Sequence, residues 1–188
     1  QMSYEHEIRL AAFKWLDELT MFDDVISWHT LVKGFNFKGN RVTLAGPQGI
    51  WKPKVLSIPI SITTSPKSPY RDNFKDGILH YAYQGEDPKH PDNVGLSKAR
   101  AQGIPLIYFY GLMPGKYLAA WPVFIIEENP QTLFFSVVVD DKKFVKNKPY
   151  VHNEEDLSRR KYVTTAVRSR IHQKAFRIRV LEAYQSQC

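Results

Sequence analysis

Residues 70–85 read YRDNFKDGILHYAYQG, and the fold is inferred outward from this stretch. A β-strand is expected over 78–83, directly after Asp76-Gly77. The side chains around this strand suit a nucleobase, because a carboxylate accepts a hydrogen bond from an exocyclic amine such as cytosine N4 and a tyrosine ring stacks on a base. An ordinary hairpin with half-buried tyrosines is the alternative. The candidate pocket residues are Tyr70, Asp72, Asp76, Tyr81, Tyr83 and Gln84.

On both sides of this stretch, short runs rich in Val, Ile, Phe and Tyr alternate with Gly, Pro and Asn clusters, a pattern typical of β-strands. The predicted strands are 41–45, 55–63, 78–83, 105–110, 117–126 and 133–139. One internal helix is expected over 94–102, capped by Asn93 and ended by Gly103. Six short strands with one internal helix predict an α+β chain whose residues 35–141 form a small, partly closed β-barrel.

Helical segments are expected at both ends of this barrel. Ser3 and Ser27 are N-caps for two amphipathic helices, which predict an N-terminal helical subdomain over 3–34. Residues 142–158 are polar and predict a linker, and 159–188 predict a basic helical segment. Because the apolar positions of this last segment do not follow one helical stripe, a break is expected near His172.

Composition and charge limit the classes of function. Hydrophobic residues make up 43% of the 188 residues, enough for a packed core, so a disordered chain is excluded. The longest apolar runs are too short for a membrane span, no secretion signal opens the chain, and the single cysteine is the last residue, so a cytoplasmic protein is expected. Residues 159–188 hold eight Lys or Arg against one acid, which accounts for the whole net charge of +7. Such a segment favours phosphates or an acidic partner.

Standard catalytic motifs are not found in the sequence. There is no glycine-rich phosphate loop, no G-x-S-x-G and no H-E-x-x-H, and the six histidines lack ligand spacing. The paired acids are adjacent in sequence and suit solvated turns. We therefore expect no catalytic residue, no metal and no cofactor in this chain.

A second candidate region is the loop GPQGIWKP at 46–53. Glycine lets a ligand approach the backbone, and Trp51 beside Lys52 offers stacking together with a phosphate contact. The alternative is a rigid turn whose tryptophan fills the core.

The order of these motifs resembles that of the SRA (SET- and RING-associated) domain of the PUA superfamily. The resemblance covers about 35–141: a Gly-Ile-Trp-Lys-Pro loop, a Tyr-x-Asp…Asp-Gly…Tyr-x-Tyr-x-Gly strand, Asp92-Asn93-x-x-Leu96, and Gly103-Ile-Pro-Leu-Ile-Tyr. The family has His-Arg where this chain has Trp51-Lys52, and threonine where it has Gln84. The resemblance implies that an extruded cytosine is bound, with Asp76 or Asp72 as acceptor and Tyr83 or Tyr70 as stacking ring.

The C-terminal segment is similar to the helix that leads into the HNH nuclease domain of bacterial modification-dependent restriction endonucleases. The similarity rests on Arg159-Arg160-Lys161 and on Phe-Arg-Ile-Arg-Val-Leu-Glu-Ala-Tyr at 176–184. It implies that the nuclease domain, with its divalent metal, lies beyond Cys188.

Together the two resemblances imply a module that reads 5-methyl- or 5-hydroxymethylcytosine in duplex DNA by base flipping. An RNA-binding PUA-like module and a structural or dimerisation domain are the alternatives, and a homodimer is left open. The expected DNA contacts are Gly49, Trp51, Lys52, Lys54, Arg71, Arg159, Arg160, Lys161, Arg168 and Arg170.

Overall fold

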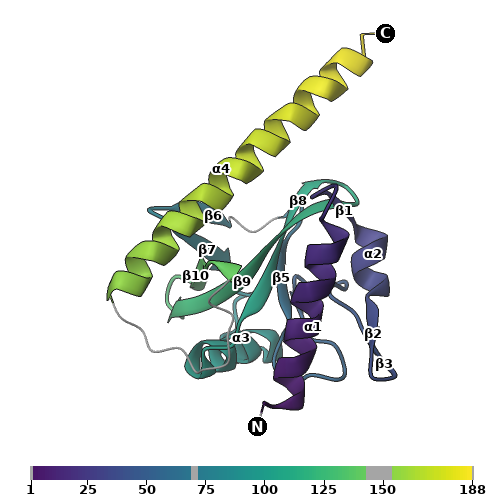
Figure 1. Cartoon of the computed structure of the whole chain (residues 1–188). Helices are drawn as coiled ribbons and strands as arrows, with labels where there is room; N and C mark the ends of the chain where they lie inside the picture. The colour runs from purple at the N-terminus through teal and green to yellow at the C-terminus, as the bar shows by residue number, and fades with distance from the viewer. Residues whose placement is uncertain (1, 69–71, 143–153, 188) are drawn as a thin grey trace.

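The protein is an α+β structure in which helices at both ends of the chain pack on a curled mixed sheet (Figure 1). The computed structural model describes residues 2–68, 72–142 and 154–187. Within these ranges no helix has both the length and the apolar character that a membrane span requires. The helices are α1 (Tyr4–Leu19), α2 (Trp28–Lys33), α3 (Pro91–Gln102) and α4 (Glu154–Gln185). The strands are β1 (Ile26–Ser27), β2 (Phe35–Phe37), β3 (Asn40–Val42), β4 (Ile50–Trp51), β5 (Ser61–Thr64), β6 (Asn73–Lys75), β7 (Ile78–Ala82), β8 (Leu106–Met113), β9 (Lys116–Asn129) and β10 (Phe134–Val139).

The main sheet has the strand order β4-β5-β8-β9-β10-β7-β6, and β1 pairs with β9. All its pairs are antiparallel except β5 with β8. The predicted α+β class is therefore confirmed. In the described part of the chain no strand ladder joins β4 to β6, so the sheet is not a closed barrel.

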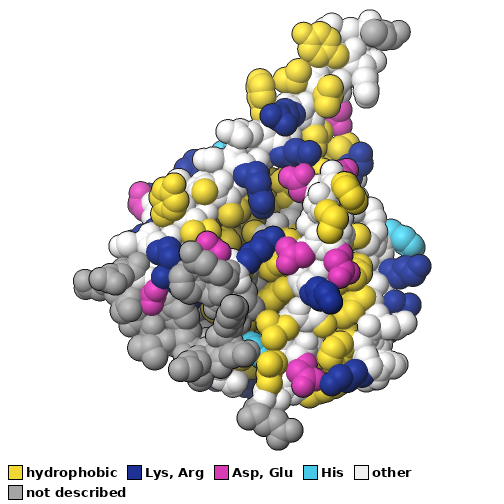
Figure 2. Space-filling model, in the orientation of Figure 1, with side chains coloured by type: hydrophobic (Ala, Val, Ile, Leu, Met, Phe, Trp, Pro, Cys, Tyr) yellow, Lys and Arg dark blue, Asp and Glu magenta, His cyan; other side chains and the backbone are white. Residues whose placement is uncertain are grey.

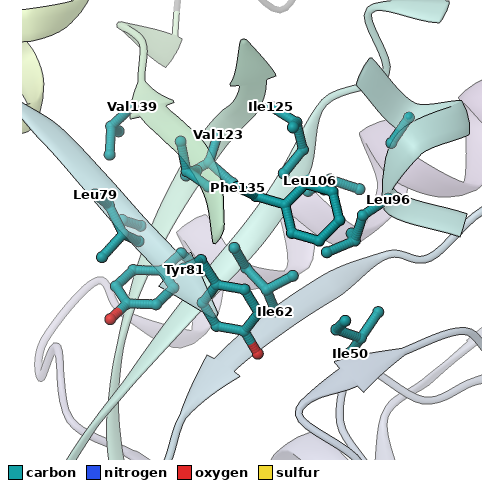
Figure 3. Close-up of a cluster of buried hydrophobic side chains, with 14 of the residues drawn as sticks. Ile50, Ile62, Leu79, Tyr81, Leu96, Leu106, Val123, Ile125, Phe135 and Val139 are labelled. Atoms are coloured by element: carbon teal, nitrogen blue, oxygen red, sulfur yellow. The ribbon is translucent and has the colours of Figure 1, made fainter. Parts of the chain in front are cut away.

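Alternating side chains of β8 and β9 divide the core into two clusters. On one face, Leu106 and Tyr108 join strands β5, β7 and β10 with α3 and α4 (Figure 3). On the other, Ile107 and Phe109 pack with α1 and α2. The residues expected to form an N-terminal subdomain thus share a core with the sheet.

A buried arginine explains why the strand predicted over 55–63 begins only at Ser61. The guanidinium of Arg9, which is 2% exposed, donates to the carbonyls of Ile58 (2.8 Å), Pro59 (2.8 Å) and Pro105 (3.3 Å). Burial lowers the pKa of Arg9 to about 10. Because these carbonyls accept from a helix side chain, they do not join a strand ladder.

The N-caps Ser3 and Ser27 are confirmed, since each side chain accepts from the backbone three residues later. The internal helix α3 begins earlier than predicted, at Pro91 with His90 as its cap. Gly103 ends it in the left-handed conformation, as expected.

Helix α4 runs without the break expected near His172, because 154–185 contain neither Gly nor Pro. Its first residues occupy part of the predicted linker, and 143–153 lie outside the described residues. The Thr164 hydroxyl accepts from the N–H of Val139 at the end of β10 (2.8 Å) and donates to the Arg160 carbonyl (2.7 Å). Beyond Ala175 the helix leaves the body of the protein (Figure 1).

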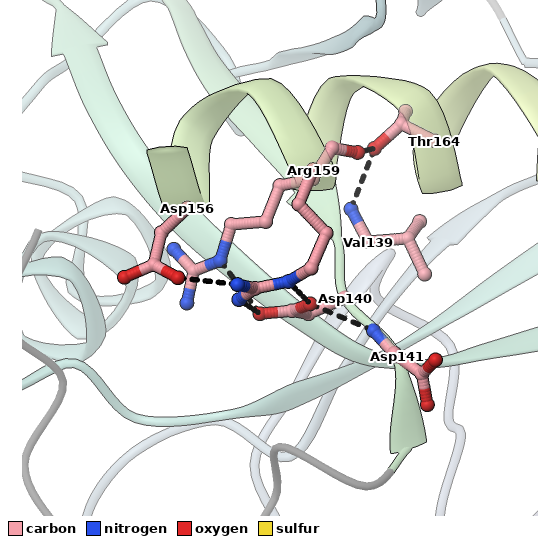
Figure 4. A network of polar contacts seen from close by, with 7 residues as sticks. Val139, Asp140, Asp141, Asp156, Arg159 and Thr164 are labelled. Atoms are coloured by element: carbon pink, nitrogen blue, oxygen red, sulfur yellow. Dashed lines mark hydrogen bonds and ion pairs between the residues drawn. The ribbon is translucent and has the colours of Figure 1, made fainter. Parts of the chain in front are cut away.

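A buried carboxylate anchors the start of α4 (Figure 4). Asp140 accepts from Arg159 (3.0 and 3.1 Å) and from Arg160 (2.8 Å), and Arg159 also bonds Asp156. Burial alone would raise the pKa of Asp140, but the two arginines outweigh it and hold the pKa below its ordinary value. Since Arg160 is 1% exposed, its predicted role as a DNA contact is wrong, and Arg159 is committed to the same anchor.

We expect Asp140→Ala to lower the free energy of unfolding by about 3–5 kcal/mol, because it leaves the Arg160 charge buried without its carboxylate. Chemical denaturation measures this loss. Glu127→Ala, an exposed carboxylate on β9, is the control and should stay within about 0.5 kcal/mol of the parent. The Asp140 contribution should also disappear in the parent as the pH falls below the ordinary carboxyl pKa of 3.8, since protonation removes the ion pair. Equal losses in the two variants would contradict this assignment.

Candidate functional site

A pocket lies where the two ends of the curled sheet approach one another. Its volume is about 130 Å³, about ten times the roughly 10–15 Å³ that one water requires, so a ring-sized group fits. It is lined by Gly49, Ile50, Thr63, Ser65, Lys67, Ser68, Asp72, Tyr81, Ala82, Tyr83 and Gln84. Four of the six predicted base-pocket residues and the predicted loop residue Gly49 therefore meet at one site.

Side chains hold the two sheet ends together. The Tyr81 hydroxyl, from β7, donates to the Thr63 carbonyl of β5 (3.0 Å). A Cβ at Gly49 would come within 2.9 Å of this hydroxyl, so a larger residue here would displace the Tyr81 hydroxyl. The Tyr81–Thr63 bond joins the two sheet ends beside the pocket, where a closed barrel would have a strand ladder.

Asp72 is the central polar group of the pocket. One carboxylate oxygen accepts from the N–H of Ala82 on β7 (2.7 Å) and the other from the Thr64 hydroxyl on β5 (2.9 Å). Because the only Thr64 hydroxyl proton is given to Asp72, the Tyr108 hydroxyl at 2.8 Å must donate to Thr64. Burial raises the pKa of Asp72, although both hydrogen bonds oppose the change. The carboxylate keeps lone pairs for a further donor.

Gln84 is fixed by its backbone. Its N–H donates to the Asn93 side chain (2.8 Å), and the Asn93 amide donates to the carbonyls of Gln84 (3.0 Å) and Asp87 (2.9 Å). The buried Asn93, predicted only as a helix cap, therefore positions the pocket wall. The Gln84 side-chain amide makes no hydrogen bond to the residues described, so it can serve a ligand as donor or acceptor.

The tyrosines do not have the predicted role. Tyr83 is 2% exposed and its ring stacks on Phe135, with centroids 4.2 Å apart, so it cannot also stack on a base. Burial accordingly raises the pKa of Tyr83. Tyr81 is 4% exposed and its hydroxyl is bonded to Thr63. The other candidate ring, Tyr70, and the neighbouring Arg71 lie outside the described residues.

Asp76 is not among the pocket-lining residues. It forms with Gly77 the two-residue turn between β6 and β7, where both residues have positive φ (54° and 74°). This is the hairpin geometry that Asp-Gly favours, and Asp76 is exposed there. The acceptor position in the pocket is held by Asp72, the alternative acid.

Trp51 does not project from its loop, contrary to the expectation of an exposed ring. Its indole N–H donates to the carbonyl (3.2 Å) and hydroxyl (3.1 Å) oxygens of Thr43, and its ring covers Gly46. Lys52 and Lys54 are exposed, and the Lys52 ammonium donates to the Leu56 carbonyl (3.2 Å). The loop therefore offers cations at the surface and no free aromatic ring.

Sequence reasoning missed the contribution of 61–68, SITTSPKS, to the pocket. Thr63, Ser65 and Lys67 line it, and Thr64 bonds Asp72. The signal was the change from an apolar strand to a polar run with Pro66, which marks a strand end lined with hydrogen-bonding groups.

Two other hollows are larger but chemically less suited to a ring with an exocyclic amine. One, of about 240 Å³, lies between α4 and β9, and its buried acid Asp140 is already paired with arginines. The other, of about 260 Å³, is lined by Trp28, Ser65, Pro66, Lys67, Pro114, Gly115 and Tyr117 and contains no carboxylate. Among the described residues no three His, Cys, Asp or Glu side chains could together hold a metal ion.

Comparison of the chain with models of protein families, with curated proteins and with solved structures gives no match.

Trp51→Ala should lower the free energy of unfolding by about 3 kcal/mol, the low end of the range for large aromatic residues, because part of the ring is exposed. Thermal or chemical denaturation measures the change. Tyr162→Ala, which removes a ring that is 77% exposed, is the matched control and should have little effect. An unchanged stability of the Trp51 variant would show that this ring is not part of the core.

Asp72→Asn should leave the protein at least as stable as the parent at neutral pH. An asparagine oxygen can accept from Ala82, its amide can donate to Thr64, and the buried charge disappears. Because the folded pKa of Asp72 is raised, any advantage of the variant exists above that pKa and vanishes as the pH falls towards 3.8. Melting temperatures measured across this range test the assignment, and a large loss at neutral pH would oppose it.

Proposed function

We propose that this chain binds duplex DNA and accommodates one extruded, modified cytosine in the pocket at Asp72. The observation that supports the proposal best is the position of Asp72, a partly desolvated acceptor held at the wall of a ring-sized pocket by two bonds to different ends of the sheet. Such an acceptor suits the exocyclic amine of cytosine. The Gln84 amide, on the same wall, suits a neighbouring position of the Watson–Crick edge.

The finer fold belongs to the same proposal. An open sheet whose ends meet through Tyr81 and Asp72 is compatible with the SRA-like, PUA-superfamily barrel that the sequence resembles. Gly49 and Ile50, from the loop region that this resemblance assigns to DNA contact, border the pocket. Asp92-Asn93-x-x-Leu96 lies on α3, and Asn93 supports the pocket wall.

Phosphates would be bound outside the pocket. Lys67 is at its wall, Lys52 and Lys54 are exposed on the adjoining loop, and Arg168 is exposed on α4. Lysine and arginine contacts of this kind supply affinity without sequence preference. Among the DNA contacts predicted from the sequence, we keep Lys161 and Arg170 in this role. Arg159 and Arg160 are removed from it, because they anchor α4.

The resemblance of the C-terminal segment extends the proposal to the cellular context. The module would supply specificity to a modification-dependent HNH restriction endonuclease, and that nuclease domain would supply the divalent metal and the cleavage.

The experiment is a binding panel of otherwise identical duplexes that carry cytosine, 5-methylcytosine or 5-hydroxymethylcytosine at one position, with a structured RNA as competitor. We expect tighter binding to one modified duplex, together with increased fluorescence of 2-aminopurine placed next to the modified base, since extrusion unstacks its neighbour. Equal affinity for all duplexes would contradict the proposal. Preference for the RNA would favour the RNA-binding alternative.

Asp72→Asn should weaken binding of the preferred duplex by about 1–3 kcal/mol, because an amide donor would then face the base amine. Asp76→Asn is the matched control: it removes the same charge from an exposed turn outside the pocket and should leave the preference unchanged. In the parent, binding of the modified base should weaken as the pH falls through the raised pKa of Asp72, and the Asp72 variant should lack this dependence. Equal effects of the two substitutions would remove Asp72 from the proposed pocket.

A further inference from the structure

The hollow of about 260 Å³ adjoins the pocket at Asp72, because Ser65 and Lys67 line both. Its walls come from three segments that are far apart in sequence: the start of α2 at Trp28, the 65–67 segment, and the turn between β8 and β9 with Tyr117 after it. We call this hollow, with the lining residues named above, the Trp28 groove. Since the groove and the pocket share two residues, one continuous ligand chain can occupy both.

Local contacts hold the walls of the Trp28 groove in place. The backbone N–H of Trp28 donates to the Gly115 carbonyl (2.9 Å), and the Trp28 ring lies against the ring of Tyr117, with centroids 5.2 Å apart. Pro66 packs on β8 at Gly111, where a Cβ would come within 2.3 Å of the proline ring. The groove is therefore formed before a ligand arrives.

Three side chains that line the groove have hydrogen-bond donors without a partner among the described residues. They are the indole N–H of Trp28, the hydroxyl of Tyr117 and the ammonium of Lys67. The indole nitrogen and the hydroxyl oxygen are both accessible to solvent. Burial raises the pKa of Tyr117, so its hydroxyl keeps the proton at neutral pH and can donate. An indole N–H and an ammonium can only donate, so the groove calls for a ligand rich in acceptors.

The charge of the groove favours an anion. Lys67 lines it and no carboxylate does, which makes it unsuited to a base amine but suited to a phosphate. The face formed by α1 and α4 differs, since Figure 2 shows acidic and basic side chains close together there. The ring of Trp28 with Pro66 and Pro114 adds apolar surface. A phosphate joined to an apolar group, as in a sugar–phosphate backbone, matches both properties.

We propose that the Trp28 groove binds the sugar–phosphate group that flanks the extruded nucleotide. This inference rests on the proposed function and adds the place where the backbone of that nucleotide is held. Lys67, Trp28 and Tyr117 donate to the phosphate oxygens, and the apolar surface of the groove contacts the deoxyribose. Extrusion rotates the nucleotide about its backbone. A flanking phosphate held beside the pocket therefore stabilises the extruded state.

Methylphosphonate linkages test the proposal, because each one removes the charge of a single phosphate and nearly keeps its shape. Three duplexes carry the preferred modified cytosine and one such linkage, placed 5′ of the modified nucleotide, 3′ of it, or at a phosphate remote from it. We expect one of the two flanking linkages to weaken binding at least about tenfold, since charge-assisted hydrogen bonds are lost. The remote linkage should have a smaller effect.

Lys67→Met and Trp28→Phe identify the groove as the site of that phosphate. Lys67 is exposed, and phenylalanine keeps an aromatic ring at position 28, so both variants should stay folded, which thermal denaturation checks. In each variant the sensitive linkage should weaken binding less than in the parent, because a donor to that phosphate is already missing. Lys14→Met is the matched control: it removes an exposed lysine of α1 that does not line the groove, so the linkage should keep its full effect.

The outcomes separate this inference from the function on which it rests. Binding that keeps its preference for the modified base but is insensitive to both flanking linkages would overturn the phosphate site alone. A linkage effect of the same size in the parent, in Lys67→Met and in Trp28→Phe would also overturn it, by placing the phosphate elsewhere. Equal affinity for modified and unmodified duplexes would overturn the proposed function and this site together.

Discussion

The candidate pocket depends on one side chain, Asp72, whose hydrogen bonds connect two ends of the curled sheet. Thr64 is the last residue of β5 and Ala82 the last residue of β7. These two strands lie near opposite ends of the sheet order. No ladder joins these ends within the described residues, so the hydrogen bonds from Thr64 and Ala82 to Asp72 connect them across the gap. A complete ladder would fill this space with backbone. The side-chain connection leaves a pocket, and the connecting group is at the same time its principal polar wall.

A second buried carboxylate, Asp140, explains why net charge alone does not show which cations of the C-terminal segment can contact a ligand. Eight cations suggest a uniform basic surface, but two of them, Arg159 and Arg160, are paired with the buried Asp140 at the end of β10, and Arg159 is also paired with Asp156. Arg159 and Arg160 differ from the other cations because they lie opposite the end of β10. There the backbone and the buried Asp140 require hydrogen-bond partners. Further along α4, Lys174 lies 3.9 Å from Asp24 and Arg170 donates to the Ala119 carbonyl (3.3 Å), whereas Arg168 is exposed and is the cation that we propose for a phosphate.

Local features were predictable from the sequence, whereas long-range partnerships were not. The caps Ser3 and Ser27, the stop at Gly103 and most strands depend on neighbours within a few residues, and the structure confirms them. The pocket was found because Asp72, Tyr81 and Gln84 lie close together in sequence. The packing of Tyr83 on Phe135 involves residues 52 positions apart and the contact of Arg9 with Pro105 residues 96 apart, so no local pattern reveals them. Trp51 illustrates the same limit, because its partner Thr43 depends on how the loop folds back.

The electrostatics of the pocket limit what can occupy it. Burial already disfavours the charged form of Asp72, as its raised pKa shows, so a second anion beside it would add repulsion in a site with little solvent. A phosphate therefore does not suit the interior. A neutral ring with an amino group suits it, because a donor to the carboxylate stabilises the charged form and replaces the water lost on binding. In the complex that we propose, Asp72 and Gln84 would face the base and Lys67 would lie at the pocket wall, while Lys52 and Lys54 on the adjoining loop would meet the backbone phosphates.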